Sequence, residues 1–154
     1  MVAEESRSPH QQLPMLTVAA ALIIDERGRI LLSQRRKDAH LGMMWEFPGG
    51  KVESGETAEA AVIRELQEEL NITPDDPEPW RFVTHDYDRF YLLMLVFKVV
   101  EFSGTPTVQE SETRAIGWFA PSELASLAFP PANAPLLTAI QRMEHHTPDD
   151  DQNP

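Results

Sequence analysis

The sequence of 154 residues contains no cysteine, which excludes disulfide bonds and thiolate metal sites and agrees with a cytoplasmic protein. It also lacks an apolar run of about 18 residues, so we expect no membrane span. Basic residues are few: 13 Lys and Arg stand against 25 Asp and Glu, giving a net charge of −12. This charge argues against binding of polymeric nucleic acid, whose affinity depends on neutralised phosphates. A single nucleotide whose phosphates are bridged by metal ions remains compatible with it.

Length and composition predict one domain with a real hydrophobic core, since 42% of the residues are hydrophobic. We expect residues 14–144 to form this domain. The polar residues 1–13 are expected to be a disordered N-terminal segment without a hydrophobic signal region. Residues 145–154, which include Asp149-Asp150-Asp151, are expected to be a disordered acidic tail.

Hydrophobic patterns predict strands mixed with helices. The apolar run 17–24 indicates a buried strand, and residues 25–28 are expected to be a hairpin turn from which a second strand returns over 29–34. A helix should begin after Thr57 as N-cap and bury a stripe formed by Ala58, Val62, Leu66 and Leu70. Further expected elements are a loop over 71–79, strands over 80–86, 90–102 and 115–119, a short helix from Pro121 and a terminal helix over 135–143. This order predicts a layered α/β domain.

The acidic face of the predicted helix carries the strongest functional signal. Glu65, Glu68 and Glu69 stand at i, i+3 and i+4, so they share one face. Like charges at this spacing cost roughly 0.2–0.5 kcal/mol per pair. A hard divalent cation, which prefers oxygen ligands, would neutralise the negative charge of such a face. The alternative is a solvated acidic helix.

This face belongs to a longer pattern that resembles the signature of the Nudix hydrolases: Gly, five residues, Glu, seven residues, then Arg-Glu-aliphatic-x-Glu-Glu-x-Gly-aliphatic. The matching residues are Gly50, Glu56, Arg64, Glu65, Leu66, Glu68, Glu69 and Ile72. Asn71 stands where the family has its last glycine. Because Asn tolerates a left-handed helix cap, we expect the turn and the activity to survive. The resemblance implies a Nudix-type α/β/α sandwich, a mixed β-sheet flanked by helices.

The resemblance also implies roles for these residues. Glu68 and Glu69 would be the principal ligands of Mg²⁺ or Mn²⁺, and Glu65 would be a ligand or orient the attacking water. The other expected members of the site are Glu56 as a supporting residue, Arg64 as the residue that orients the glutamates, and Gly49 or Gly50 as the source of a carbonyl ligand. Arg64 can at the same time form an ordinary i,i+4 ion pair with Glu68.

A general base is needed as well, and Nudix enzymes often take a carboxylate from a loop before the last strand. Two residues qualify here. Aligned with the family by its spacing back from Trp118, the loop carboxylate is Glu112, which could also be a metal ligand. Aligned by its spacing forward from Gly104-Thr105-Pro106, it is Glu110. The sequence leaves both open.

Resemblance to the MutT branch covers residues 16–143 and indicates the substrate. It is carried by Asp38-Ala39-His40, by Glu46-Phe47-Pro48-Gly49-Gly50-Lys51 and by Phe129-Pro130-Pro131-Ala132-Asn133. The implied activity is 8-oxo-dGTP diphosphatase: water attacks the β-phosphorus, and nucleoside monophosphate and pyrophosphate result. The biological role would be sanitation of the nucleotide pool in DNA replication and repair, by a monomer or homodimer.

Four residues are expected to contact the nucleotide: Arg35, Phe47, Lys51 and Asn133. The amide of Asn133 could read two edge atoms of a guanine-like base, or it could cap the terminal helix. Arg35 could instead be an exposed charge at a strand end, and Phe47 could belong to the core. A rival substrate class is CTP or 5-methyl-dCTP, which close relatives hydrolyse. A non-catalytic nucleotide sensor is also conceivable, but none of the box glutamates is missing.

Overall fold

The computed structural model describes residues 13–109 and 113–145. The predicted disorder at both ends therefore concerns residues almost entirely outside these ranges, and the candidate bases Glu110 and Glu112 also lie outside them. Within the described ranges, no helix is long and apolar enough to cross a membrane.

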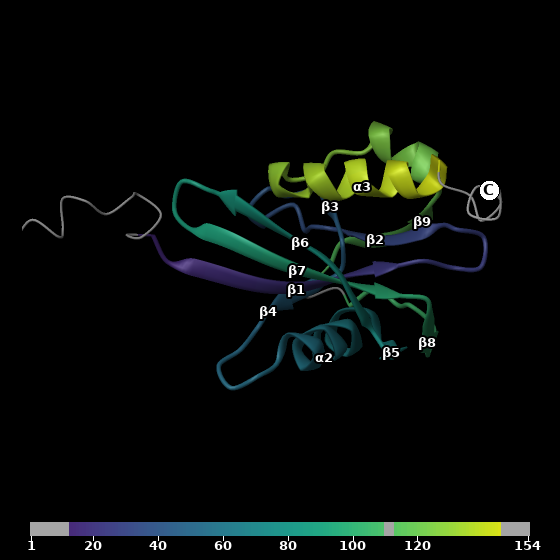
Figure 1. The fold of residues 1–154 in the computed structure, drawn as a ribbon, viewed down its shortest axis with the longest axis horizontal. Helices are drawn as coiled ribbons and strands as arrows, with labels where there is room; N and C mark the ends of the chain where they lie inside the picture. Colours follow the sequence, from purple (N-terminus) through teal and green to yellow (C-terminus); the bar gives the residue numbers. More distant parts are fainter. Residues whose placement is uncertain (1–12, 110–112, 146–154) are drawn as a thin grey trace, which may run out of the picture.

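The fold is an α/β/α sandwich, as predicted (Figure 1). One sheet has the strand order β4-β1-β7-β6, and a second has the order β3-β2-β9. Helix α2 covers one side of the sheets and helix α3 covers the other. The strands are β1 (Met15–Ile23), β2 (Ile30–Gln34), β3 (Trp45–Glu46), β4 (Gly49–Lys51), β5 (Thr73–Asp75), β6 (Glu78–Asp86), β7 (Tyr91–Val99), β8 (Glu101–Ser103) and β9 (Ala115–Phe119). The helices are α2 (Ala58–Leu70), α3 (Ala134–His145) and two 3₁₀ segments, η2 (Pro121–Ser126) and η3 (Pro131–Asn133).

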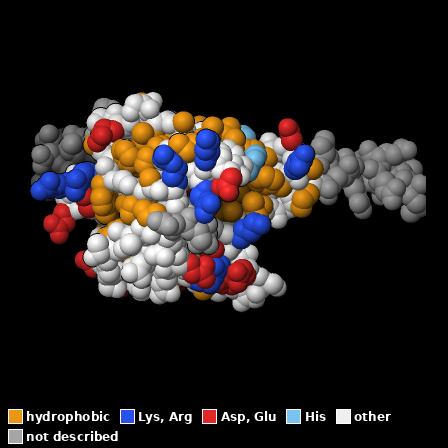
Figure 2. Space-filling model, turned by 180° about the vertical axis from the view of Figure 1, so that it is seen from behind, with side chains coloured by type: hydrophobic (Ala, Val, Ile, Leu, Met, Phe, Trp, Pro, Cys, Tyr) orange, Lys and Arg blue, Asp and Glu red, His pale blue; other side chains and the backbone are white. Residues whose placement is uncertain are grey.

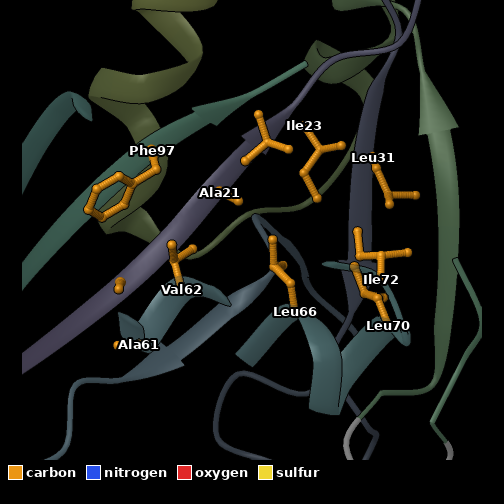
Figure 3. Packing of buried hydrophobic residues seen from close by; sticks show 11 residues of the cluster. Ala21, Ile23, Leu31, Ala61, Val62, Leu66, Leu70, Ile72 and Phe97 are labelled. Atoms are coloured by element: carbon orange, nitrogen blue, oxygen red, sulfur yellow. The ribbon is translucent and has the colours of Figure 1, made fainter. Parts of the chain in front are cut away.

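Both faces of strand β1 are apolar, and each is covered by a helix. It pairs in parallel with β7 and antiparallel with β4, which makes the sheet mixed. Ala19, Ala21 and Ile23 belong to the core under α2, whereas Ala20 and Leu22 belong to the core under α3. Figure 3 shows the first of these cores, with Val62 and Leu66 of α2 among its members. A strand buried on both sides reads as a continuous hydrophobic run, which is what the sequence shows.

Helix α2 has the two caps that the sequence predicts. The Thr57 hydroxyl accepts a hydrogen bond from the amide of Ala60 at 3.1 Å. At the other end Asn71 adopts φ 59° and ψ 37°, a left-handed cap. The amide of Asn71 donates to the carbonyl of Gln67 at 3.1 Å, which is the single bond of an αL-type helix end. The helix that carries the glutamates is thus fixed at both termini.

Three local predictions were wrong. The turn at 25–28 exists, but β1 and β2 do not form a hairpin ladder. A bridge joins Ile24 to Ile30 beside the turn, and β2 pairs with β3 and β9 in the second sheet. The region 71–79 is not all loop, since it contains β5 and the start of β6. Its prolines are tolerated because Pro74 lies in a short two-stranded pair and Pro79 lies at a register shift of the edge strand β6. The strand expected over 90–102 is broken at Val100 into β7 and β8.

Candidate active site

The candidate site lies where β4 meets α2. Gly49 and Gly50 of β4 pair with Ala20 and Ala19 of β1, so the backbone of β4 runs directly beside the acidic helix. A Cβ atom on Gly49 would collide with the carbonyl oxygen of Ala19, and one on Gly50 would collide with the carboxylate of Glu65. Both glycines are therefore needed for close approach, one to the sheet and the other to the site.

Arg64 is the centre of the acidic cluster. Its guanidinium donates to both oxygens of Glu56, with Nε–Oε2 at 2.7 Å and Nη2–Oε1 at 3.0 Å. Its Nη1 donates to Glu65 at 2.9 Å and to Glu68 at 3.2 Å, and its Nη2 donates to the carbonyl of Lys51 at 3.0 Å. The pair with Glu68 is the predicted i,i+4 pair. The hydrogen bond from Arg64 lowers the pKa of Glu56 to about 2, so this carboxylate is ionised at neutral pH.

Glu69 is separated from this cluster and is buried. The sequence pattern did not predict this burial, since it indicated only that Glu69 shares a helix face with Glu65 and Glu68; Glu69 is only 6% exposed. Its carboxylate accepts hydrogen bonds from the amide of Gly49 at 3.1 Å and from the hydroxyl of Thr113 at 3.2 Å. Burial and then the negative charge of Glu46 raise its pKa to about 7, against these hydrogen bonds. Glu69 therefore takes up a proton far more readily than an ordinary glutamate.

Two site residues were missed by sequence reasoning, Glu46 and Thr113. Glu46 lies on β3, and its pKa is raised by burial although Arg35 donates to it at 2.6 Å. It was visible in the sequence as part of the Glu-Phe-Pro-Gly-Gly-Lys segment, but no pattern showed that it would face Glu69. Thr113 is 2% exposed and follows Glu112 directly in the chain.

Three of the residues expected to contact the nucleotide lie on or next to the strands that surround the acidic residues. Arg35 is half-buried, pairs with Glu46 and also donates to the carbonyl of His40 at 2.8 Å. Phe47 is 4% exposed and stacks on Phe129 with ring centroids 6.0 Å apart, so its side chain lies in the core. Lys51 is exposed on β4. Phe47 thus lies in the core, the alternative that the sequence left open for it, whereas Arg35 is half-buried and ion-paired and is not an exposed strand-end charge. Contact of these residues with a nucleotide stays a prediction.

Asn133 has an unusual environment. It is 1% exposed, and its Nδ2 donates to the carbonyl of Pro130 at 3.3 Å. Its Oδ1 is buried and accepts no hydrogen bond from any described residue. The side chain therefore does not make the capping bond to α3 that was one of its two predicted roles. A buried acceptor without a donor costs roughly 1–3 kcal/mol, so such a group indicates a missing partner.

A hard divalent cation fits the donor set. Glu65, Glu68 and Glu69 offer carboxylate oxygens, the ligand type that Mg²⁺ and Mn²⁺ prefer. Over residues 13–109 and 113–145, however, no three acidic or histidine side chains are already gathered as a metal-binding group. Arg64 donates hydrogen bonds to Glu56, Glu65 and Glu68. Glu69 instead accepts hydrogen bonds from Gly49 and Thr113. Binding a cation would therefore require these carboxylates to exchange some of their present donors.

Comparison with known proteins places this site in context. A model of the NUDIX domain matches residues 14–140. The chain is 34% identical over 128 residues to an 8-oxo-dGTP diphosphatase of Escherichia coli, covering 83% of this chain and 98% of that protein. It is 35% identical over 138 residues to a CTP pyrophosphohydrolase of the same organism, covering 90% and 100%. The crystal structure of a MutT NUDIX hydrolase from Burkholderia pseudomallei superposes with a TM-score of 0.70 at 32% identity, covering 82% of this chain and 96% of that one.

Proposed function

The chain belongs to the Nudix hydrolase family, whose members generally depend on divalent metal ions, and we propose that its substrate is 8-oxo-dGTP, hydrolysed to the nucleoside monophosphate and pyrophosphate. Overall identity does not choose between this substrate and CTP, because relatives of both kinds are about equally similar. The choice therefore rests on individual residues.

The single observation that favours a purine is the environment of Asn133. A carboxamide both donates and accepts, so it can pair with two edge atoms of a guanine-like base. In this chain the Oδ1 is buried without a donor among the described residues, while the Nδ2 has only a long bond to Pro130. A bound base that donates to Oδ1 would remove the cost of that unpaired acceptor. The Pro-Pro-Ala-Asn segment in which Asn133 stands is also the segment that resembles the MutT branch.

A divalent cation, Mg²⁺ or Mn²⁺, would neutralise phosphate charge at this site and make a bound water a better nucleophile. Glu65, Glu68 and Glu69 would hold the ion, with a carbonyl of Gly49 or Gly50. Arg64 positions the carboxylates through the bonds described above, and Glu56 keeps Arg64 in place. Gly49 donates its amide to Glu69 and so orients that carboxylate.

A proton must leave the attacking water, and we assign this step to a loop carboxylate, Glu112 or Glu110. Both lie outside the described residues. The neighbour of Glu112, Thr113, donates to Glu69 at 3.2 Å, and this adjacency supports Glu112. The substrate of the proposed enzyme is a free nucleotide of the nucleotide pool. We propose that the protein acts in the cytoplasm.

The test of this proposal is the substrate selectivity of Asn133→Ala. We expect the ratio of kcat/KM for 8-oxo-dGTP to that for dGTP to fall by about ten-fold or more, because a site built to hydrogen-bond a base edge discriminates through those bonds. Hydrolysis of dGTP itself should change less. An unchanged ratio would remove Asn133 from base recognition and reopen the pyrimidine alternative.

A further inference from the structure

A basic depression lies beside the candidate active site and has no role in the chemistry above. It has a volume of about 770 Å³ and is lined by Arg36, Lys37, Asp38, Thr113 and Arg114. Three of these side chains are cationic and one is anionic. In a chain with a net charge of −12, such a concentration of positive charge is unusual. Figure 2 shows Lys and Arg side chains gathered on one face of the molecule, near a group of acidic ones.

The depression is connected to the catalytic helix through Thr113. The hydroxyl of Thr113 donates to the buried carboxylate of Glu69, and the next residue, Arg114, reaches into the depression. Thr113, which lines the depression, therefore contacts a proposed metal ligand directly. An anion that binds metal ions at the glutamates could extend directly towards Arg114.

Arg114 is held in place by a short chain of hydrogen bonds. Its Nη1 donates to Oε1 of Gln34 at 2.7 Å, and Nε2 of Gln34 donates to the carbonyl of Met43 at 2.9 Å. The amide of Arg114 also donates to the carbonyl of Gln34 at 2.9 Å. A guanidinium has five N–H donors, so one bond to Gln34 orients it and leaves capacity for a phosphate.

We propose that this depression binds the distal phosphates of the nucleotide, with Arg114 and Lys37 as the residues that distinguish a triphosphate from a monophosphate. The inference rests on the proposed function, because it assumes that the reacting β-phosphate lies at Glu65, Glu68 and Glu69 and that the γ-phosphate extends from there into the depression. The same groups would contact inorganic pyrophosphate, the other product. A depression of about 770 Å³, the size of an ordinary small-molecule pocket, and the acidity of the rest of the chain favour a short oligophosphate over a polymer.

The test uses the full chain with Mg²⁺ and compares the wild type, Lys37→Gln, Arg114→Gln and the double variant. Arg142→Gln on α3 is the matched control, since it removes one exposed positive charge away from the depression. We expect the double variant to raise the KM for 8-oxo-dGTP by about ten-fold, as each lost charged phosphate contact weakens binding a few-fold. Inhibition by pyrophosphate should weaken to a similar degree. Inhibition by 8-oxo-dGMP, which has no distal phosphates, should stay within two-fold of the wild type, a threshold of about 0.4 kcal/mol.

Two results would overturn the inference. One is a double variant whose KM and pyrophosphate inhibition match those of Arg142→Gln. The other is an equal loss of affinity for 8-oxo-dGMP and pyrophosphate, which would indicate a general disturbance of the site. If the wild type does not hydrolyse 8-oxo-dGTP at all, the proposed function fails. Calorimetric binding of pyrophosphate to the wild type and the double variant then still decides whether the depression binds phosphates.

Discussion

Arg64 holds Glu56 through two parallel hydrogen bonds, from Nε at 2.7 Å and from Nη2 at 3.0 Å. This paired geometry is specific to a guanidinium and is stronger than a single ionic contact. Because Glu56 precedes α2 and Arg64 lies within it, the pair ties the turn of residues 50–56 to the helix. The same guanidinium contacts Glu65 and Glu68, so one residue sets the positions of three carboxylates.

We expect Arg64→Lys to lower kcat by at least about ten-fold and to raise the concentration of Mg²⁺ needed for half-maximal activity, because an ammonium cannot make the paired contact. The KM for the nucleotide should change little. The measurement is a Mg²⁺ titration of pyrophosphate release. Arg29→Lys is the matched control, since Arg29 bonds Asp25 at 2.8 Å in the β1–β2 turn. Equal behaviour of the two variants would contradict the assigned role of Arg64.

The neighbouring glycines should separate stability from activity. In Gly49→Ala the new methyl group meets the backbone of Ala19, which cannot move aside, so we expect a loss of about 1–3 kcal/mol in the free energy of unfolding. In Gly50→Ala the atoms nearest to the new methyl group belong to the carboxylate of Glu65, a side chain that can rotate away. This variant should keep most of its stability and lose most of its activity. Urea unfolding and pyrophosphate release, measured on both variants, check the contrast, and identical stability losses would refute it.

Glu69 should make the metal-free protein less stable as pH rises. Its pKa is about 7 in the folded chain and 4.5 as an ordinary glutamate, so the folded state binds more protons between these values. The stabilisation is therefore complete below about pH 4.5 and is lost as pH rises through 7. It amounts to about 3 kcal/mol, since one pKa unit corresponds to roughly 1.4 kcal/mol.

The variant Glu69→Gln removes the titration of Glu69, because a neutral amide cannot titrate, together with its charge coupling to Glu46. In the presence of a chelator, we expect the difference in unfolding free energy between wild type and variant to shift in favour of the variant from pH 4.5 to pH 8. The variant should also be inactive. The low pKa of Glu56 acts below this pH window and does not interfere. A difference that stays constant with pH would show that Glu69 titrates normally.

Asn71 provides a test of the departure from the family signature. With φ at 59° it adopts a conformation that glycine accepts freely and that alanine resists. We expect Asn71→Ala to cost about 1 kcal/mol and Asn71→Gly to change the unfolding free energy by less than about 0.5 kcal/mol. Activity should survive in both variants. Chemical denaturation measures the two costs, and a large loss in Asn71→Gly would mean that the Asn side chain has a further role.

The sequence was sufficient to predict the parts of the molecule that depend on local patterns. The caps of α2, its acidic face and the doubly buried strand β1 follow from residue spacing and capping chemistry. The pairing of β2 with β9 and the proximity of Glu46 to Glu69 depend on contacts between segments far apart in the sequence, which no local pattern encodes. Burial of Glu69 was missed for the same reason, because Thr113 and Gly49 reach it from elements far apart in the chain.

The most direct test of the whole account is pyrophosphate release with Mg²⁺ from a panel of 8-oxo-dGTP, dGTP, CTP, 5-methyl-dCTP and ADP-ribose. The account predicts a strong preference for 8-oxo-dGTP and loss of activity when Mg²⁺ is removed. A preference for a cytosine nucleotide would retain the acidic helix as the catalytic element but contradict the role of Asn133. Release of no pyrophosphate from any triphosphate would contradict the proposed reaction itself.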